Sequence, residues 1–212
     1  MMKIIGIIPC RNNSSRFPGK PLLDLGGKPM VQRVYEQAQK SILDKLIVAT
    51  DDERIYNTVL AFGGEAIMTS YKHRSGTDRC LEALQKIEGN FDGIINIQGD
   101  EPFIHPEQIT QIAHCFQQKN TQIATLAKAV FRKKDVLDVN VPKVFFNGQM
   151  LATAFEREVN FNNNTQFYHH VGIYGYTNKV LSEITKLQPS KNEIKKRLEQ
   201  LRWLDNGYDI RV

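Results

Sequence analysis

Through its first 120 residues the chain alternates short apolar runs with segments of helical periodicity. The apolar runs, 3–8, 45–49 and 93–97, contain no regular polar alternation, which is typical of strands covered on both faces in a parallel sheet. The segments between them place apolar residues three and four positions apart, as amphipathic helices do. This pattern predicts a doubly wound, mostly parallel α/β fold of Rossmann type.

Local signals predict where the helices of this part begin. Pro29 suits the first turn of one helix, and Asp51-Asp52 offers a cap for the next. A third helix is predicted over 77–87, with Leu81, Leu84 and Ile87 on one face, and Pro106 begins a fourth.

After residue 120 the pattern changes to strands. Apolar runs at 122–130, 141–146, 150–155 and 168–176 predict a β-rich insertion at about 122–176, inside a single domain that spans 1–212. Asn147-Gly148 between two of these runs is a strong hairpin signal.

The C-terminal segment predicts one long helix. Ser190 can cap it, and Gly207 can end it. The helix would carry an apolar stripe made of Ile194, Leu198, Leu201 and Leu204. Such a stripe packs either on a partner chain or on the chain's own sheet.

Cysteine content and charge limit the classes of function. Cys10, Cys80 and Cys115 are an odd number with no close spacing, so neither a disulfide framework nor a paired-cysteine metal site is indicated, and a cytoplasmic location is expected. The apolar run 4–10 is too short to span a membrane and lacks a signal cleavage site. The net charge of +5 fits a small polyanion as well as nucleic acid, and because charge alone suggests nucleic acid, no nucleic-acid partner is expected.

The segment 9–20 follows the first predicted strand directly, at the end where open α/β sheets bind ligands. It holds Arg11, Arg16 and Lys20 together with two serines and a glycine. Arginine can make forked contacts to phosphate oxygens, and lysine neutralises their charge. The spacing matches neither the Walker loop nor the dinucleotide fingerprint. We interpret the segment as a triphosphate-binding loop, and a solvated basic loop is the alternative.

Two further loops carry polar residues at the same predicted edge. Gln98-Gly99-Asp100-Glu101 follows the third apolar run, and its acidic pair could hold Mg²⁺ against phosphate oxygens or form an exposed turn. The segment 73–79 opens a helix, whose free N–H groups could face an anion or a base edge. Its alternative is a plain Thr77 cap followed by Asp78.

These segments resemble a known family. PCRNNSSRFPGKPL, HRSGTDR, NIQGDEP, HHVGIYGY and LEQLR are similar, in the same order, to motifs of the bacterial 3-deoxy-manno-octulosonate (Kdo) cytidylyltransferases. The related acylneuraminate cytidylyltransferases lack the PGKPL ending. The resemblance covers 3–212 and implies a nucleotide-diphospho-sugar transferase-like fold. It also implies a homodimer, with 122–176 contributing to the sugar site and the dimer contact.

The resemblance also implies residue roles. Arg11, Arg16 and Lys20 would hold the triphosphate of CTP, Ser75 and Gly76 would face the cytosine, and Asp100 would bind Mg²⁺. Arg16, Lys20 and Asp100 would act in catalysis. The sugar would be bound by Arg79, Gln98, His170, Tyr174 and Glu199. Taken without the family, His170 and Tyr174 are more typical of a packed core, and Glu199 of a surface charge.

The reaction implied is attack of the 2-hydroxyl of Kdo on the α-phosphorus of CTP, which gives CMP-Kdo for lipopolysaccharide biosynthesis and releases pyrophosphate. Two alternatives stay open: a cytidylyltransferase for another 2-keto sugar acid, and a CTP-binding paralogue without turnover.

Three departures from the family motivate those alternatives. The family continues beyond the position of Val212 with a segment like GVDTPEDL, whose aspartate completes the metal site, so the chain is expected to be C-terminally shortened. Phe155 stands where the family has an arginine for the sugar carboxylate, and Arg157, two residues on, could replace it. Lys196 stands at an acidic position of the family.

Overall fold

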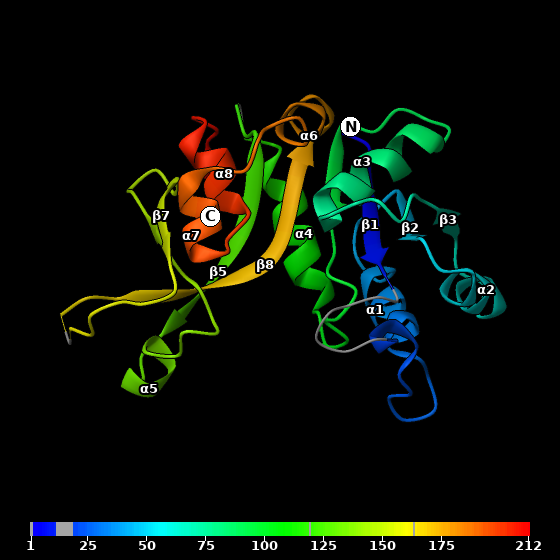
Figure 1. The fold of residues 1–212 in the computed structure, drawn as a ribbon, viewed down its shortest axis with the longest axis horizontal. Helices are drawn as coiled ribbons and strands as arrows, with labels where there is room; N and C mark the ends of the chain where they lie inside the picture. The colour runs from blue at the N-terminus through cyan, green and yellow to red at the C-terminus, as the bar shows by residue number, and fades with distance from the viewer. Residues whose placement is uncertain (1, 12–18, 119, 163) are drawn as a thin grey trace.

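One mixed sheet runs through the molecule (Figure 1). The computed structural model describes residues 2–11, 19–118, 120–162 and 164–212. Within them the strands follow the order β3-β2-β1-β4-β8-β5-β9, and β6 and β7 branch off beside β8. The strands are β1 (Ile4–Cys10), β2 (Lys45–Thr50), β3 (Ala66–Met68), β4 (Gly93–Asn96), β5 (Ile123–Val130), β6 (Lys143–Phe146), β7 (Ala152–Glu156), β8 (Phe167–Thr177) and β9 (Ile210–Arg211).

The N-terminal part of the sheet is parallel. β1 pairs in parallel with β2 and β4, and β2 pairs in parallel with β3. β8 then adds to β4 in the antiparallel direction and also pairs with β5 and β6. The predicted doubly wound α/β fold is confirmed, and the predicted β-rich segment 122–176 holds β5 to β8.

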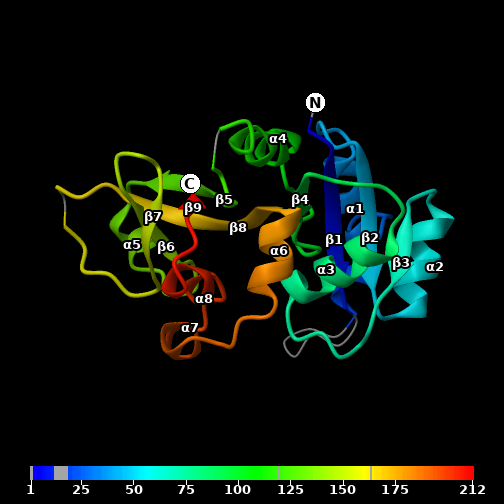
Figure 2. The same cartoon turned by 90° about the horizontal axis from the view of Figure 1, so that it is seen from above.

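Helices cover both faces of the sheet and create two cores. The helices are η1 (Lys20–Leu22), α1 (Met30–Ala38), α2 (Glu53–Ala61), α3 (Gly76–Lys86), α4 (Pro106–Cys115), α5 (Lys133–Val136), α6 (Asn178–Ile184), α7 (Lys191–Lys196) and α8 (Gln200–Asp205). Ile5 and Ile7 of β1 pack with residues of α3, α6 and α8, whereas Ile4 and Ile8 pack with α1, α2 and α4. Figure 2 shows α4 and α6 on opposite sides of β4 and β8. None of the helices in the described part of the chain has the length and apolar character needed to cross a membrane.

The observed N-terminal cap agrees with the predicted one at α2 and differs from it at α3. Asp52 caps α2 by accepting from the backbone N–H groups of Arg54 and Ile55, as predicted. α3 begins one residue earlier than predicted, and Ser75 caps it by accepting from Asp78 N at 3.1 Å. Ser75 has the extended backbone that a cap needs, whereas Thr77 is buried inside the first turn.

The predicted hairpin joins β6 and β7, but its turn is longer than an Asn-Gly pair. Asn147 O accepts from Met150 N, and Asn147 N donates to Leu151 O. Met150, rather than Gly148, takes the left-handed conformation, with φ 60°. This is a turn followed by a left-handed residue, the usual form of a three-residue hairpin loop.

The prediction of one long C-terminal helix is wrong. Ser190 and Glu193 form a capping box for α7, but Arg197 adopts φ 55° and ends the helix before α8 begins. Leu198 and Leu201 are then buried in the chain's own core, and Ile194 stays 68% exposed. Within the described residues the three leucines of the stripe therefore pack in the chain's own core, and Ile194 does not.

Candidate active site

A cleft of about 1000 Å³ lies at the carboxyl ends of β1 and β4, where the beginning of α3 faces α7 and the beginning of α8. It brings together predicted residues from distant parts of the sequence. Those lining it are Arg11, Lys20, Ser75, Gly76, Arg79, Gln98, Asp100 and Glu199. The opposite wall contains Glu193, Ile194 and Arg197 from α7 and the residue after it. Parallel strands meet at one edge of a sheet, which is why loops so far apart in sequence share this cleft.

Three predicted residues are not part of the described lining. Arg16 falls in 12–18, outside the described residues. His170 and Tyr174 are buried in a neighbouring aromatic cluster, where the ring of Tyr174 meets that of Trp203 edge-on at 5.0 Å. Burial lowers the pKa of His170 to about 4, and its Nε2 lies 2.9 Å from Thr125 Oγ1. A role for His170 and Tyr174 in sugar binding stays a prediction.

Lys20 and Asp100 form an ion pair at the cleft. Lys20 Nζ donates to Asp100 Oδ2 at 2.7 Å, with the two side chains 35% and 50% exposed. Burial and the charge of Asp100 raise the pKa of the adjacent Glu101, while Lys20 acts to lower it. A cation and two carboxylates thus lie close together, an arrangement that can exchange partners when a charged ligand enters.

The loop after β4 is pressed closely onto the end of β1. A side chain at Gly99 would place its Cβ 2.7 Å from Cys10 Sγ and 3.2 Å from Pro9 O, so only glycine fits this approach. Burial raises the pKa of the Cys10 thiol to about 12, which leaves it as a packing residue without nucleophilic character.

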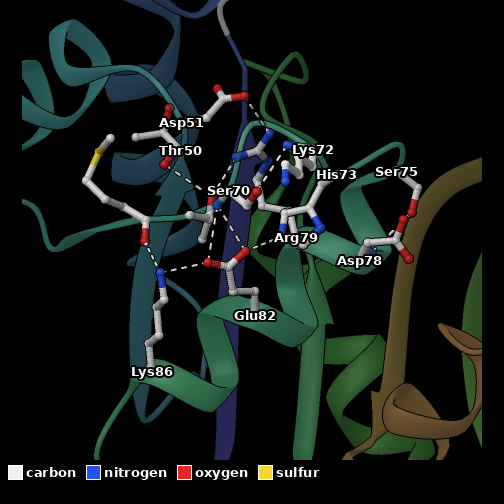
Figure 3. Close-up of polar contacts among 12 residues, drawn as sticks. Thr50, Asp51, Ser70, Lys72, His73, Ser75, Asp78, Arg79, Glu82 and Lys86 are labelled. Carbon is white, nitrogen blue, oxygen red and sulfur yellow. Dashed lines mark hydrogen bonds and ion pairs between the residues drawn. The ribbon is translucent and has the colours of Figure 1, made fainter.

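Arg79 is held firmly although it lines the cleft (Figure 3). Its side chain is only 3% exposed, and its guanidinium donates to Thr69 Oγ1 at 2.5 Å and to Asp51 Oδ2 at 2.9 Å. Sequence reasoning treated Asp51 as part of a helix cap and missed this contact. Asp51 directly follows the second strand of the parallel sheet, and a carboxylate at that position is a signal for a residue at the ligand-binding edge.

Glu199 lies where α8 begins and is largely withdrawn from solvent. Burial raises its pKa, and hydrogen bonding to Ser75 and Thr77 and the charge of Arg202 work in the opposite direction. Nearby, Arg202 makes a two-pronged contact with Glu193, at 2.8 Å from Nε and 2.5 Å from Nη2. This end of the cleft therefore combines a half-buried carboxylate with the guanidinium of Arg202, which Glu193 holds in place.

Comparison with known proteins identifies the family. A sequence model described as "Cytidylyltransferase" matches residues 5–210. The 3-deoxy-manno-octulosonate cytidylyltransferase of Parabacteroides distasonis is 55% identical over all of this chain and 90% of its own length. That of Bacteroides thetaiotaomicron is 51% identical over all of this chain and 89% of its own length. This chain belongs to the 3-deoxy-manno-octulosonate cytidylyltransferase family.

A solved structure agrees with this assignment to a family of nucleotidyltransferases. It is described as CMP:2-keto-3-deoxy-manno-octonic acid synthetase complexed with CTP, and it matches with a TM-score of 0.93 and 40% identity. The match covers 99% of this chain and 88% of the other.

The departures from the family pattern have structural consequences. Phe155 is fully buried and meets the ring of His170 edge-on at 5.2 Å. Arg157 donates to Lys196 O at 3.0 Å and to three further carbonyl oxygens, and it does not line the cleft. The hypothesis that Arg157 replaces the family's arginine has no support in this structure. Lys196 pairs with Glu156 at 2.6 Å.

A metal ion at this site would need oxygen atoms from a bound phosphate compound in addition to the side chains of this chain. Among the described residues no group of three or more histidine, cysteine, aspartate or glutamate side chains could hold a metal ion by itself. Asp100 is half exposed in the cleft, and carboxylate oxygen is the ligand type that Mg²⁺ prefers. The residues present fit an ion that is shared between Asp100 and phosphate oxygens.

Proposed function

We propose that this chain transfers CMP from CTP to the 2-hydroxyl of Kdo and releases pyrophosphate. The observation that carries the proposal is the pairing of Lys20 with Asp100 at 2.7 Å in a cleft that also contains Arg11 and the beginning of α3. A relative of known structure is described as a synthetase complexed with CTP, which supports CTP as the nucleotide.

Binding of CTP would rearrange the ion pair. Arg11 and Lys20 would contact the triphosphate, and Lys20 would exchange the Asp100 carboxylate for phosphate oxygens. Arg16, from the segment 12–18, would add a third cation. Ser75 and the backbone at Gly76 would face the cytosine, because the start of a helix offers N–H groups to polar edges.

Asp100, released from Lys20, would bind Mg²⁺ together with phosphate oxygens. The bound ion would supply charge neutralisation for the triphosphate and for the attacking oxygen. Lys20 and Arg16 would offset the charge of the leaving pyrophosphate. In-line attack on the α-phosphorus needs mainly positioning and electrostatic stabilisation from the protein, and these residues would provide both.

The sugar acid would occupy the other end of the cleft. Arg79 and Gln98 line it there, and Arg79 keeps a fixed orientation through Asp51 and Thr69. Glu199 would contact sugar hydroxyls, and its raised pKa increases the fraction that can donate as well as accept a hydrogen bond. His170 and Tyr174 would support this end from the aromatic cluster behind it.

A competition assay tests the acceptor. Pyrophosphate release is measured with CTP and Mg²⁺, with Kdo and other 2-keto sugar acids offered singly and in mixtures. We expect Kdo to give the highest kcat/KM. Preference for another acid would favour the second candidate, which the burial of Phe155 at the family's arginine position motivates. CTP binding by calorimetry with no pyrophosphate release from any acceptor would contradict both.

A further inference from the structure

One wall of the cleft is a loop that has little backbone support of its own. The segment 69–75 joins β3 to α3 and contributes His73, Arg74 and Ser75 to the cleft. Among the described residues, no backbone-to-backbone hydrogen bond involves 70–74. A loop without such bonds keeps its shape only if side chains hold it.

Glu82 of α3 supplies two contacts to that loop (Figure 3). Its carboxylate accepts from Ser70 N at 2.9 Å and contacts the Nε2 of His73. It also pairs with Lys86 at 2.6 Å. Glu82 is only 20% exposed and does not line the cleft. It therefore lies behind the wall and reaches it through Ser70 and His73.

Two other side chains of α3 are hydrogen-bonded to the residues at the start of this loop, Met68 and Thr69. Arg79 donates to Thr69 Oγ1, and Lys86 donates to Met68 O at 2.9 Å. Arg79, Glu82 and Lys86 are three and four positions apart, so they share one face of the helix. Of these three side chains, Glu82 is the one that is hydrogen-bonded to residues within 70–74.

The charge of Glu82 is secured by its partners. Burial acts to raise its pKa, but hydrogen bonds from Lys86, from Ser70 N–H and from His73 outweigh burial and lower the pKa to about 2. The side chain is thus a carboxylate at neutral pH and can accept from both loop residues at once.

We propose that Glu82 is a positioning residue, which holds the wall 70–75 in the shape that binds CTP without touching the nucleotide. The proposal rests on the proposed function, in which Ser75 faces the cytosine. It predicts a defect in CTP binding that is larger than any change in the chemical step.

The first test replaces the carboxylate in the full chain. Glu82→Ala should weaken CTP binding, measured by calorimetry, at least about tenfold, with kcat at saturating CTP and Kdo changed less than about threefold. Glu82→Gln keeps an oxygen for Ser70 N–H and should recover part of the affinity. Glu36→Ala is the matched control, because Glu36 also accepts from two side chains and has a lowered pKa but lies outside the cleft lining.

A double-mutant cycle with His73→Ala separates positioning from general loss of stability. If Glu82 acts through His73, the two single changes should weaken CTP binding by more in sum than the double change does. A normal CTP affinity in Glu82→Ala would overturn the proposal, and so would a loss that is fully additive with His73→Ala and is not recovered in part by Glu82→Gln. If Glu82→Ala does not fold, Glu82→Gln and His73→Ala carry the same comparison.

The result also distinguishes this proposal from the proposed function. Normal CMP transfer by the unchanged protein, with normal CTP affinity in the Glu82 variants, overturns only the role of Glu82. Failure of the unchanged protein to bind CTP overturns both.

Discussion

Lys20 and Asp100 lie 80 positions apart in the sequence and 2.7 Å apart in the cleft. Their meeting was predictable, because each follows a strand of the parallel part of the sheet and such strands end at the same edge. The burial of His170 and Tyr174 was harder to predict from the sequence. Both are on β8, and their surroundings depend on how α8 packs against that strand.

His170 gives a prediction about stability and pH. Its pKa falls from the ordinary value of 6.5 to about 4 in the folded chain because of burial. The unfolded chain therefore binds this proton more readily, so the stability contributed by neutral His170 is complete above pH 6.5 and declines as the pH falls toward 4. We expect His170→Gln to remove this part of the pH dependence.

The measurement is chemical unfolding of both proteins at several pH values between 7 and 4. The difference in free energy of unfolding between the unchanged chain and His170→Gln should shrink as the pH decreases. Two curves that stay parallel would show that His170 has the same pKa in the folded and unfolded chains, as a solvated imidazole does.

At the scale of elements, local sequence signals predict the strands and helix caps that are determined by residues close together in the chain. The strands of the parallel part, the Asp52 cap and the Ser190 capping box all follow from short-range patterns. The break at Arg197 was not predictable, because a long polar side chain carries no signal for a left-handed backbone. Met150 is the second case, because its side chain likewise carries no signal for the left-handed conformation that it adopts.

The hairpin turn offers a test of backbone strain. Met150 has φ 60° and is 43% exposed, so Met150→Gly should relieve the left-handed penalty and raise the free energy of unfolding by about 1 kcal/mol. Gln149→Gly, at the preceding residue of the same turn, should instead lower it by up to about 1 kcal/mol. Equal effects of the two changes in urea unfolding would contradict the assigned turn.

At the scale of the whole molecule, β8 connects the two parts of the sheet. It pairs with β4 on one side and with β5 on the other, and Tyr174 and Tyr176 on it pack against Trp203 of α8. Helix α8 is therefore part of the core, whereas α7 has no buried residue. A homodimer stays a prediction from the family, and sedimentation at several protein concentrations would test it.

Trp203 tests whether α8 belongs to the core. The side chain is 1% exposed, so Trp203→Ala should lower the free energy of unfolding by about 3–5 kcal/mol. Ile194→Ala, on the neighbouring helix but 68% exposed, should change it by no more than about 0.5 kcal/mol. A small effect at Trp203 in the monomeric chain would mean that a partner buries this helix instead.

The central claim is that this cleft joins CMP from CTP to Kdo with the help of Asp100. The most direct measurement is product analysis by mass spectrometry after incubation with CTP, Kdo and Mg²⁺, using the unchanged chain and Asp100→Asn. We predict CMP-Kdo from the unchanged chain and at least about 10²-fold less from Asp100→Asn, with the same thermal unfolding in both. Pyrophosphate release without CMP-Kdo, or near-normal product from Asp100→Asn, would contradict the account.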